Sequence, residues 1–373
     1  MRSVDVAVVG AGPAGLCAAA EAARHGCEVA LLDENAAAGG QLFKQIHKFF
    51  GSRAHGAGRR GIDIGAELLD EVADLGVHVC LEAPVWGLYE GKTLAVATSD
   101  RSWKLGFTAI VLATGATENG LAFPGWTLPG VMGAGCVQTM VNVHRVLPGE
   151  RVLMVGSGNV GLIVAYQLLQ AGAEVAAVVD VLPCVGGYPV HAAKVARAGV
   201  PILTGHTVKE VRGDGCVEEA TVWALGGDGR GMPGSERAFA VDTVAIAVGL
   251  TPMTELAWLA GCAMLYVPEL GGHVPLHDGR MATSVPGVFV AGDASGVEEA
   301  SSAMEEGRLA GIWAAVAAGR AEEEAAAAAA EPHAAALEAL RSGPYGARVQ
   351  RGKEALTGGA AAAQAQILGG GGV

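Results

Sequence analysis

Blocks of apolar residues divide the start of the chain into three predicted elements. Residues 4–10, VDVAVVG, are a short β-branched run of the kind that forms a buried strand. Residues 13–26, PAGLCAAAEAARHG, read as a helix with Pro13 in its first turn and Gly26 at its end. Residues 27–34, CEVALLDE, return to a strand pattern that ends in two acids. The pattern predicts a strand–helix–strand unit.

The same pattern returns in the middle of the chain. Residues 150–155, ERVLMV, read as a strand, residues 159–172, NVGLIVAYQLLQAG, as a helix, and residues 173–180, AEVAAVVD, as a second strand. In both copies the glycine that closes the helix lies sixteen residues after the first glycine of the preceding turn. Two copies are too few for a solenoid. The chain is therefore expected to contain two separate folds of this type.

Each copy carries G-x-G-x-x-G between its first strand and its helix. In a dinucleotide-binding fold these glycines permit a tight turn and the close approach of a pyrophosphate to the helix N-terminus, and an acid after the second strand holds a ribose hydroxyl. A glycine-rich turn used only for packing is the alternative. The expected contacts are Gly10, Gly12, Pro13, Ala14, Gly15, Asp33 and Glu34 in the first copy, and Gly156, Gly158, Asn159, Val160, Gly161 and Asp180 in the second.

Composition narrows the class of protein. A chain of 373 residues with 51% hydrophobic residues has room for two or three domains. Its net charge of −13 and its lack of a basic block argue against nucleic-acid binding. The seven cysteines are scattered and form no C-x-x-C, which argues against a disulfide framework, an iron–sulfur cluster or a zinc site. This cysteine usage fits a reducing cytoplasm.

Residues 152–173 carry no charge and are long enough to raise the question of a membrane span. The sequence GSGNVG inside this stretch is unsuited to a spanning helix, so no span is expected. Asp5 and the first glycine cluster likewise interrupt the apolar core that a signal peptide needs. A cytoplasmic location is expected from both observations.

Further motifs resemble those of the two-dinucleotide-binding flavoproteins, the pyridine nucleotide-disulfide oxidoreductase type. GGQL at 39–42 is similar to their flavin-contacting turn, and AIVLATGA at 109–116 to the strand and turn beside FAD. TSVPGVFVAGDA at 283–294 is similar to the motif whose aspartate binds the ribityl chain. The resemblance covers roughly residues 4–318.

The resemblance implies an α/β fold with two Rossmann-like domains and hydride transfer between a nicotinamide and a flavin. Asp293 is then expected to bind the ribityl chain, and the helix that begins near Ala300 to face the flavin pyrimidine. Further residues implied for FAD are Gly40, Gln41, Val85, Ala113, Thr114, Gly115 and Gly292, and Gly249 is implied for NAD.

The order of these motifs predicts the domain organisation. An FAD-binding domain of residues 1–118 and 243–320 is interrupted by an NAD(P)-binding domain of residues 119–242. Residues 321–373 form an Ala/Gly-rich tail, for which a helix with a break near Pro332 and a disordered end are expected.

Asp180 bears on the choice of nucleotide. Residues 181–190, VLPCVGGYPV, contain no arginine to hold a 2′-phosphate, and the acid would repel one. NAD(H) is therefore expected in preference to NADP(H).

The stretch between the two folds contains a single cysteine. Residues 123–150 hold only Cys136, near the position of the second redox cysteine of thioredoxin reductases, and one sulfur cannot form an intramolecular disulfide. Cys136 therefore has either a redox role through a flavin adduct or mixed disulfide, or no role beyond starting a helix. In the locally basic stretch 44–61, Lys44 and His47 are candidates for attracting or protonating a substrate, against a plain connecting loop. No metal-ligand cluster is readable.

The sequence PGWTLPGVMGAG, residues 124–135, resembles the pyridine-nucleotide-type subunits of amine and imino-acid dehydrogenases: sarcosine oxidase, L-proline dehydrogenase, opine oxidase and hydrogen cyanide synthase. This resemblance implies a hetero-oligomer in which a second flavoprotein subunit oxidises the amine. Any iron–sulfur cluster would belong to a small partner protein, because no cysteine follows Cys262. The alternatives are a stand-alone NADH-dependent flavin reductase and a structural nucleotide-binding subunit.

Overall fold

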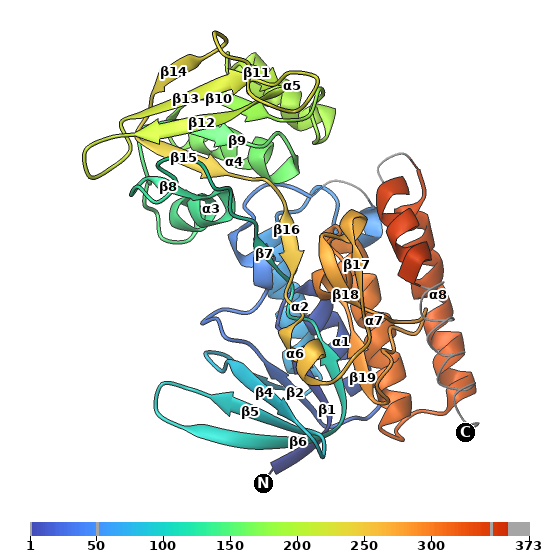
Figure 1. Cartoon of the computed structure of the whole chain (residues 1–373). Helices are drawn as coiled ribbons and strands as arrows, with labels where there is room; N and C mark the ends of the chain where they lie inside the picture. The colour runs from blue at the N-terminus through green and yellow to red at the C-terminus, as the bar shows by residue number, and fades with distance from the viewer. Residues whose placement is uncertain (1, 50–51, 344–345, 357–373) are drawn as a thin grey trace, which may run out of the picture. The chain divides into compact units, whose positions relative to one another are not determined.

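The chain divides into two compact units. The computed structural model describes residues 2–49, 52–343 and 346–356. One unit contains residues 1–117 and 251–373, and the other contains residues 118–250 (Figure 1). The second unit is thus an insertion in the first. Two short strands, β7 (Ala116–Glu118) and β16 (Leu250–Pro252), pair where the chain passes from one unit to the other and back.

The first unit is built on a seven-stranded sheet. Strands β3, β2, β1 and β6 are parallel neighbours in that order, and β19 joins the carboxyl half of β6. The amino half of β6 instead continues into an antiparallel meander with β5 and β4. The strands are β1 (Arg2–Val9), β2 (Val29–Leu32), β3 (His78–Cys80), β4 (Val85–Tyr89), β5 (Thr93–Ala97), β6 (Ser102–Leu112) and β19 (Val288–Val290).

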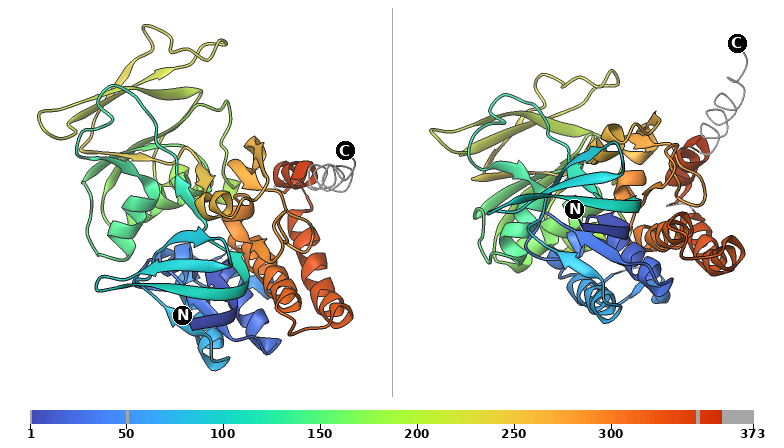
Figure 2. Two further views of the ribbon diagram at one scale, coloured as in Figure 1. Left: turned by 60° about the horizontal axis from the view of Figure 1, so that its bottom comes forward. Right: turned by 90° about the horizontal axis from the view of Figure 1, so that it is seen from below.

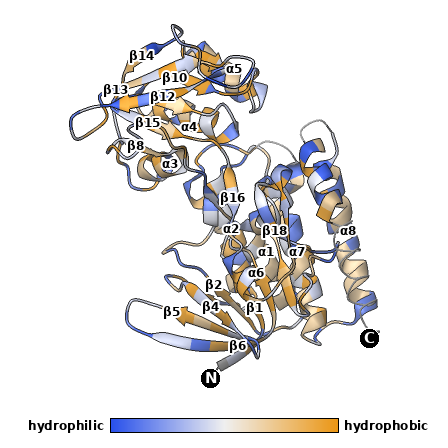
Figure 3. Ribbon diagram, in the orientation of Figure 1, coloured by the Kyte–Doolittle hydropathy of each residue, from blue (hydrophilic) through white to orange (hydrophobic). Residues whose placement is uncertain are grey.

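Both faces of this sheet are covered because its parallel strands are apolar on both sides, as Figure 3 shows in orange. Val6 and Val8 of β1 face a core shared with helices α1, α2 and α7, whereas Ala7 and Val9 face the meander and helix α6. The helices of this unit are α1 (Pro13–Arg24), α2 (Gly61–Asp74), α6 (Glu255–Leu259), α7 (Ala300–Ala317) and α8 (Glu323–Arg341).

Shorter elements complete the first unit. Strands β17 (Met264–Val267) and β18 (Gly272–Pro275) form a hairpin. The short 3₁₀ helices are η1 (Gly40–Lys44), η2 (Arg53–His55), η3 (Pro268–Leu270) and η4 (Gly292–Ser295).

Helices α1 and α7 approach closely through small residues. A Cβ on Gly307 would lie 2.1 Å from the Ala14 carbonyl oxygen, and one on Gly311 would lie 2.3 Å from that of Ala18. No larger residue fits at these two positions without moving a helix. This contact places α7 directly over the first turn of α1.

The second unit has a five-stranded parallel sheet in the order β11-β10-β9-β15-β8. Helices α3 (Ala134–Asn142), α4 (Asn159–Gln170) and α5 (Pro189–Arg197) accompany it. A three-stranded antiparallel sheet follows, made of β12 (His206–Arg212), β13 (Glu219–Ala224) and β14 (Arg237–Ala240). The parallel strands are β8 (Val131–Gly133), β9 (Arg151–Val155), β10 (Glu174–Asp180), β11 (Ile202–Thr204) and β15 (Thr243–Ile246).

The predicted fold class is confirmed, since each unit contains a parallel sheet whose central strand leads through a glycine turn into a helix. Residues 243–250, which the sequence motifs assigned to the first domain, lie instead in the second unit. The physical reason is pairing: β15 is the strand between β9 and β8 in the second sheet. Among the described helices, none has the length and apolar character that crossing a bilayer requires.

The predicted tail is largely folded onto the first unit, which corrects the sequence expectation. Helix α8 continues through Pro332 without a break and lies beside α7, as Figures 1 and 2 both show. Its buried Ala326, Ala330 and Leu337 supply packing that offsets the ~3 kcal/mol cost of an internal proline. Residues 347–356 are also helical, with Leu356 buried against the β17–β18 hairpin. The end expected to be disordered lies partly in residues 357–373, outside the described residues.

Candidate nucleotide-binding sites

The turn after β1 accepts only glycine at its first and third conserved positions. Gly10 has φ +102°, and a Cβ there would lie 2.2 Å from the Ala113 carbonyl oxygen. A Cβ on Gly15 would lie 1.7 Å from the carbonyl oxygen of Gly10. The turn therefore packs backbone against backbone, and the α1 N-terminus is left with no acidic side chain in its first turn. This is an anion-binding helix end.

Asp33 holds this turn in place from the end of β2. It is only 7% exposed. Its Oδ2 accepts the Ala11 N–H at 2.6 Å, and its Oδ1 accepts the Asn35 N–H at 2.8 Å. A carboxylate has about four acceptor positions, so it retains capacity for a ligand hydroxyl. Its neighbour Glu34 is exposed.

The Gly39–Gly40 pair lies directly on the first glycine turn. The Gly39 N–H donates to the Ala11 carbonyl at 2.7 Å. A Cβ on Gly40, which has φ +52°, would lie 2.7 Å from the Cα of Gly12. The structure therefore brings the predicted GGQ motif and the G-x-G-x-x-G motif together, with the Gln41 side chain exposed beside them.

Two more predicted segments meet at the same end of the sheet. The Ala113 N–H donates to the Val9 carbonyl at 2.8 Å, which ties the end of β6 to the end of β1. The Thr114 hydroxyl donates to the Met253 carbonyl at 2.5 Å, and Gly115 has φ +77°. Val85 is half-buried at the start of β4, in the meander.

Asp293 lies in η4, the segment that follows β19. Its Oδ1 accepts the Glu298 N–H at 3.1 Å. Burial raises the pKa of Asp293 to about 7, and the carboxylates of Glu306, Glu298 and Glu299 add to the effect. A buried carboxyl in this state is suited to ligand hydroxyls that donate to it. Ala300 is the first residue of α7, so the predicted helix begins where expected.

The second unit repeats the first turn almost atom for atom. Gly156 has φ +109°, and its Cβ would lie 2.1 Å from the Ala247 carbonyl oxygen. A Cβ on Gly161 would lie 2.1 Å from the carbonyl oxygen of Gly156. The α4 helix starts at Asn159, again with no acid in its first turn. A second anion-binding helix end results.

Asp180 takes the place of Asp33 in this unit, with one additional bond. Its Oδ2 accepts both the Ser157 N–H and the Ser157 hydroxyl at 2.6 Å, and its Oδ1 accepts the Leu182 N–H at 2.9 Å. Gly249, with φ +121°, accepts the Asn119 N–H at 3.0 Å through its carbonyl. The Val160 side chain is exposed.

A second glycine pair was not predicted from the sequence. Gly186 and Gly187 lie on the second turn as Gly39 and Gly40 lie on the first: the Gly187 N–H donates to the Ser157 carbonyl at 2.8 Å. The Tyr188 N–H donates to Oδ1 of Asn159 at 2.8 Å, which gives Asn159 a loop-holding role. The signal was present, because each pair begins 29 or 30 residues after the first glycine of its motif.

The three catalytic candidates lie in separate settings. Cys136 is exposed in the first turn of α3, where the Glu118 carboxylate accepts the Gly135 N–H at 2.6 Å and so occupies the helix start. Lys44 ends η1, and the ring of His47 stacks on Phe49 with centroids 6.3 Å apart. Among the described residues, no group of three or more acidic, histidine or cysteine side chains is arranged to hold a metal ion.

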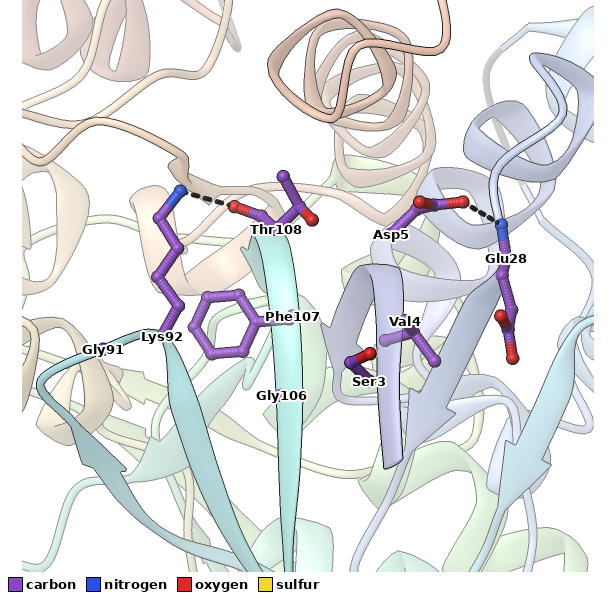
Figure 4. Close-up of a pocket in the computed structure, with 9 residues that line it drawn as sticks. All are labelled: Ser3, Val4, Asp5, Glu28, Gly91, Lys92, Gly106, Phe107 and Thr108. Atoms are coloured by element: carbon purple, nitrogen blue, oxygen red, sulfur yellow. Dashed lines mark hydrogen bonds between the residues drawn. The ribbon is translucent and has the colours of Figure 1, made fainter. Parts of the chain in front are cut away.

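A cavity of about 350 Å³ lies elsewhere in the first unit (Figure 4). It is lined by residues at the amino end of β1, whereas the glycine turn follows the carboxyl end. The Lys92 Nζ donates to the Thr108 carbonyl at 2.7 Å, and the Asp5 carboxylate accepts the Glu28 N–H at 2.8 Å. These polar groups already bond within the protein, so the cavity is not part of the nucleotide site.

Comparison with known proteins agrees with this geometry. The model of the family described as pyridine nucleotide-disulphide oxidoreductase matches residues 4–307. The chain belongs to this family. The predicted superfamily is thereby confirmed, together with the general class of oxidoreductase.

Curated relatives include components of opine and sarcosine oxidases. The first listed component of opine oxidase from Rhizobium meliloti is 31% identical over 83% of this chain and 62% of its own length. Its counterpart from Agrobacterium tumefaciens is 32% identical, over 83% and 64%. The alpha subunit of sarcosine oxidase from a Corynebacterium species is 32% identical, over 84% and 33%. The chain thus spans less than two thirds of the length of these relatives.

Solved structures share the fold. Thioredoxin reductase of T. acidophilum superposes with a TM-score of 0.67 at 24% identity, covering 85% of this chain and 99% of that one. L-proline dehydrogenase of P. horikoshii gives a TM-score of 0.63 at 23% identity, covering 83% and 55%.

The first unit fits FAD, the flavin that this family binds, by the shape of its cradle. The positions that face one another between Gly10, Gly12 and Gly40 have no side chains, and a Cβ at Gly10 or Gly40 would collide with backbone. Asp33 and Asp293 provide acceptors for hydroxyl groups, and the α1 N-terminus provides donors for a pyrophosphate.

Proposed function

We propose that this chain is an FAD-dependent, NAD-linked oxidoreductase subunit of an amine or amino-acid dehydrogenase complex. The observation that carries the proposal is the duplicated glycine turn, with its buried acid and its covering glycine pair, once in each unit. Two such turns in one chain provide for two dinucleotides. Flavin and nicotinamide together supply hydride transfer, and the protein supplies binding, orientation and exclusion of water.

In this proposal the first unit holds FAD. The α1 N-terminus binds the pyrophosphate, Asp33 accepts a hydroxyl of the adenosine ribose, and Asp293 accepts hydroxyls of the ribityl chain. The assignment of FAD to this unit rests on Asp293, because the described part of the second unit has no equivalent buried carboxyl beyond Asp180.

The second unit is proposed to hold NAD(H) in preference to NADP(H). The Asp180 carboxylate lies at the end of β10, where it accepts the Leu182 N–H. The segment from there to Tyr188 contains no lysine or arginine. A 2′-phosphate placed here would meet an anion and no cation, which disfavours NADPH.

The family name includes disulfide chemistry, which we do not propose for this chain. A dithiol mechanism needs two adjacent cysteines, and the stretch between the two folds contains Cys136 alone. The electron acceptor or donor of the flavin is therefore proposed to be a partner, a second flavoprotein subunit. The similarity to components of opine oxidase and sarcosine oxidase supports that choice.

Two measurements on the purified chain test the proposal. The protein is expected to contain FAD, and anaerobic NADH is expected to bleach the flavin absorption band. NADH is expected to bind more tightly than NADPH by about tenfold or more, because like charges in an interface cost several kcal/mol. A clear NADPH preference would contradict the NAD assignment.

The outcomes also separate the alternative functions. Bound FAD that NADH fails to reduce would favour a structural nucleotide-binding subunit. Rapid turnover of NADH with a quinone or small redox protein, without any partner, would favour a stand-alone reductase. That alternative is kept because the chain matches nearly the whole length of a thioredoxin reductase fold. Co-purification with a second flavoprotein would favour the complex.

A further inference from the structure

A buried carboxylate, Glu306 of α7, connects the Asp293 loop to the C-terminal segment. It is 1% exposed. Its Oε2 accepts the Gly292 N–H at 2.9 Å and the Ser295 hydroxyl at 2.7 Å. These two donors lie on either side of Asp293 in the chain. Glu306 therefore fixes both ends of η4, the short helix that carries the proposed ribityl contact.

The other oxygen of Glu306 is held by two cations from residues beyond 320. The Lys353 Nζ donates to Oε1 at 2.7 Å, and the Arg341 guanidinium donates to the same atom. Burial alone would raise the pKa of Glu306, but Lys353 and Arg341 outweigh it and hold the pKa at about 2. The carboxylate is thus ionised and fully hydrogen-bonded at neutral pH.

The same two cations also bind the loop directly. Lys353 donates to the Ser295 carbonyl at 3.0 Å and to the Ser295 hydroxyl at 2.8 Å. Arg341 binds Glu298 through two parallel bonds, one of which, from Nε to Oε2, is 3.0 Å long. The Glu298 N–H is in turn the donor to Asp293. The C-terminal segment therefore holds the loop at several points between Gly292 and Glu298.

We propose that Glu306, with Arg341 and Lys353, is a positioning residue that sets the Asp293 loop for FAD, so that FAD retention depends on the C-terminal segment. The proposal rests on the proposed function, because it takes FAD as the ligand of this loop. Arg341 and Lys353 serve a second purpose: they balance the charges of Glu298 and Glu306, both of which act on the Asp293 carboxyl.

The neighbouring residue Glu305 offers a matched control. It is also buried on α7 and also pairs with α8, through His333 Nδ1 at 2.7 Å. Its remaining partners are His55 and Arg308, so its hydrogen bonds go to residues outside the loop 292–298. Glu305→Gln therefore loosens α8 from α7 to a similar degree and leaves the Asp293 loop anchored.

The test compares Glu306→Gln with Glu305→Gln in the full chain. FAD dissociation constants are measured by flavin fluorescence, well below both melting temperatures. Glu306→Gln is expected to raise the FAD dissociation constant by about tenfold or more, which corresponds to about 1.4 kcal/mol or more, whereas Glu305→Gln changes it less than about twofold. Equal losses of FAD affinity in the two variants would overturn the proposal, because they would show a general effect of α8.

Hydrogen exchange on the apoprotein supplies a readout that needs no flavin. The peptide covering residues 292–298 is expected to exchange faster in Glu306→Gln than in Glu305→Gln. Unchanged exchange would overturn the anchoring role. If the wild-type chain binds no FAD, the proposed function fails, while this comparison still decides whether Glu306 holds the loop.

A double variant guards against simple misfolding. Lys353→Met in the Glu306→Gln background removes a buried cation that has lost its nearest carboxylate, so melting temperature is expected to recover in part. FAD affinity is expected to stay low, because the anchor of Gly292 and Ser295 is still weakened. Recovery of FAD affinity together with melting temperature would contradict a positioning role.

Discussion

The two glycine turns have the same backbone but different surroundings. Ala14 in the first turn and Val160 in the second occupy the same position in the motif, yet Ala14 is 5% exposed and Val160 is 41% exposed. In the first unit α7 lies over this position, with Gly292 and Gly307 against Ala14. In the second unit the apolar side chains of Val160, Val181 and Leu182 remain exposed around the turn.

This difference suggests two ways of using one nucleotide fold. The first turn is enclosed by α7, the Asp293 loop and the ion pairs behind it, as suits a cofactor that stays bound. The second turn is open, as suits a nucleotide that exchanges. The pairs of equivalent residues in the two units allow the comparison to be tested by matched substitutions.

The largest effect is expected from the first glycine of each turn. Gly10→Ala and Gly156→Ala place a Cβ 2.2 and 2.1 Å from a carbonyl oxygen, at φ +102° and +109°. Gly10→Ala is expected to weaken FAD binding by about a hundredfold or more, which needs only ~2.7 kcal/mol. Gly156→Ala is expected to retain FAD and lose reduction by NADH. Flavin content and stopped-flow reduction measure the two outcomes, and loss of FAD from both variants would break the comparison.

The enclosure itself is tested by exchanging side chains at the equivalent position. Ala14→Val must fit between α1 and α7, and overpacking of this kind costs about 1–3 kcal/mol. Val160→Ala removes an exposed side chain and is expected to change stability by less than about 0.5 kcal/mol. Denaturant unfolding measures both. Equal costs would show that the second turn is also enclosed.

How far the sequence predicted this structure depends on the range of the interactions. The glycine turns and acids were predictable because G-x-G-x-x-G and its following acid are local, and the structure brings Gly10 and Asp33 together through Ala11. The paired roles of Glu306 and Lys353 were not predictable, because 47 residues separate them and the alanine-rich sequence between them suggested a tail. The domain boundary at 243 was missed for a similar reason: only strand pairing reveals that β15 belongs between β9 and β8.

A pH dependence is expected from the first unit, where Asp293 has its raised pKa. Because the folded pKa of about 7 exceeds the ordinary value of 3.8, the apoprotein is stabilised at low pH and loses that contribution as pH rises through 7. Asp293→Asn removes this penalty. The melting temperature of the apo variant relative to wild type is expected to increase from pH 5 to pH 8 by a few degrees, since 1 kcal/mol shifts it by about 2–4 °C. A constant difference across this range would contradict the raised pKa.

The smallest effect is expected from the one hydroxyl that distinguishes the two acids. Ser157→Ala makes the second turn like the first, which has Ala11 at this position, and removes one bond to Asp180. Losing a hydrogen bond to a charged group costs about 1.5–3 kcal/mol at most sites, part of which the remaining N–H bond absorbs. NADH affinity is expected to fall less than about tenfold, with FAD affinity unchanged. A change in FAD affinity would show that the two turns are not independent.

Hydrogen exchange with each nucleotide added separately tests the assignment of the two turns most directly. FAD is expected to protect peptides covering residues 10–16, 39–44 and 292–298 and to leave residues 156–162 unprotected. NADH added to the FAD-loaded protein is expected to protect residues 156–162 and 181–188. Protection of the same glycine turn by both nucleotides, or of the second turn by FAD, would contradict the division of the chain into a flavin unit and a nicotinamide unit.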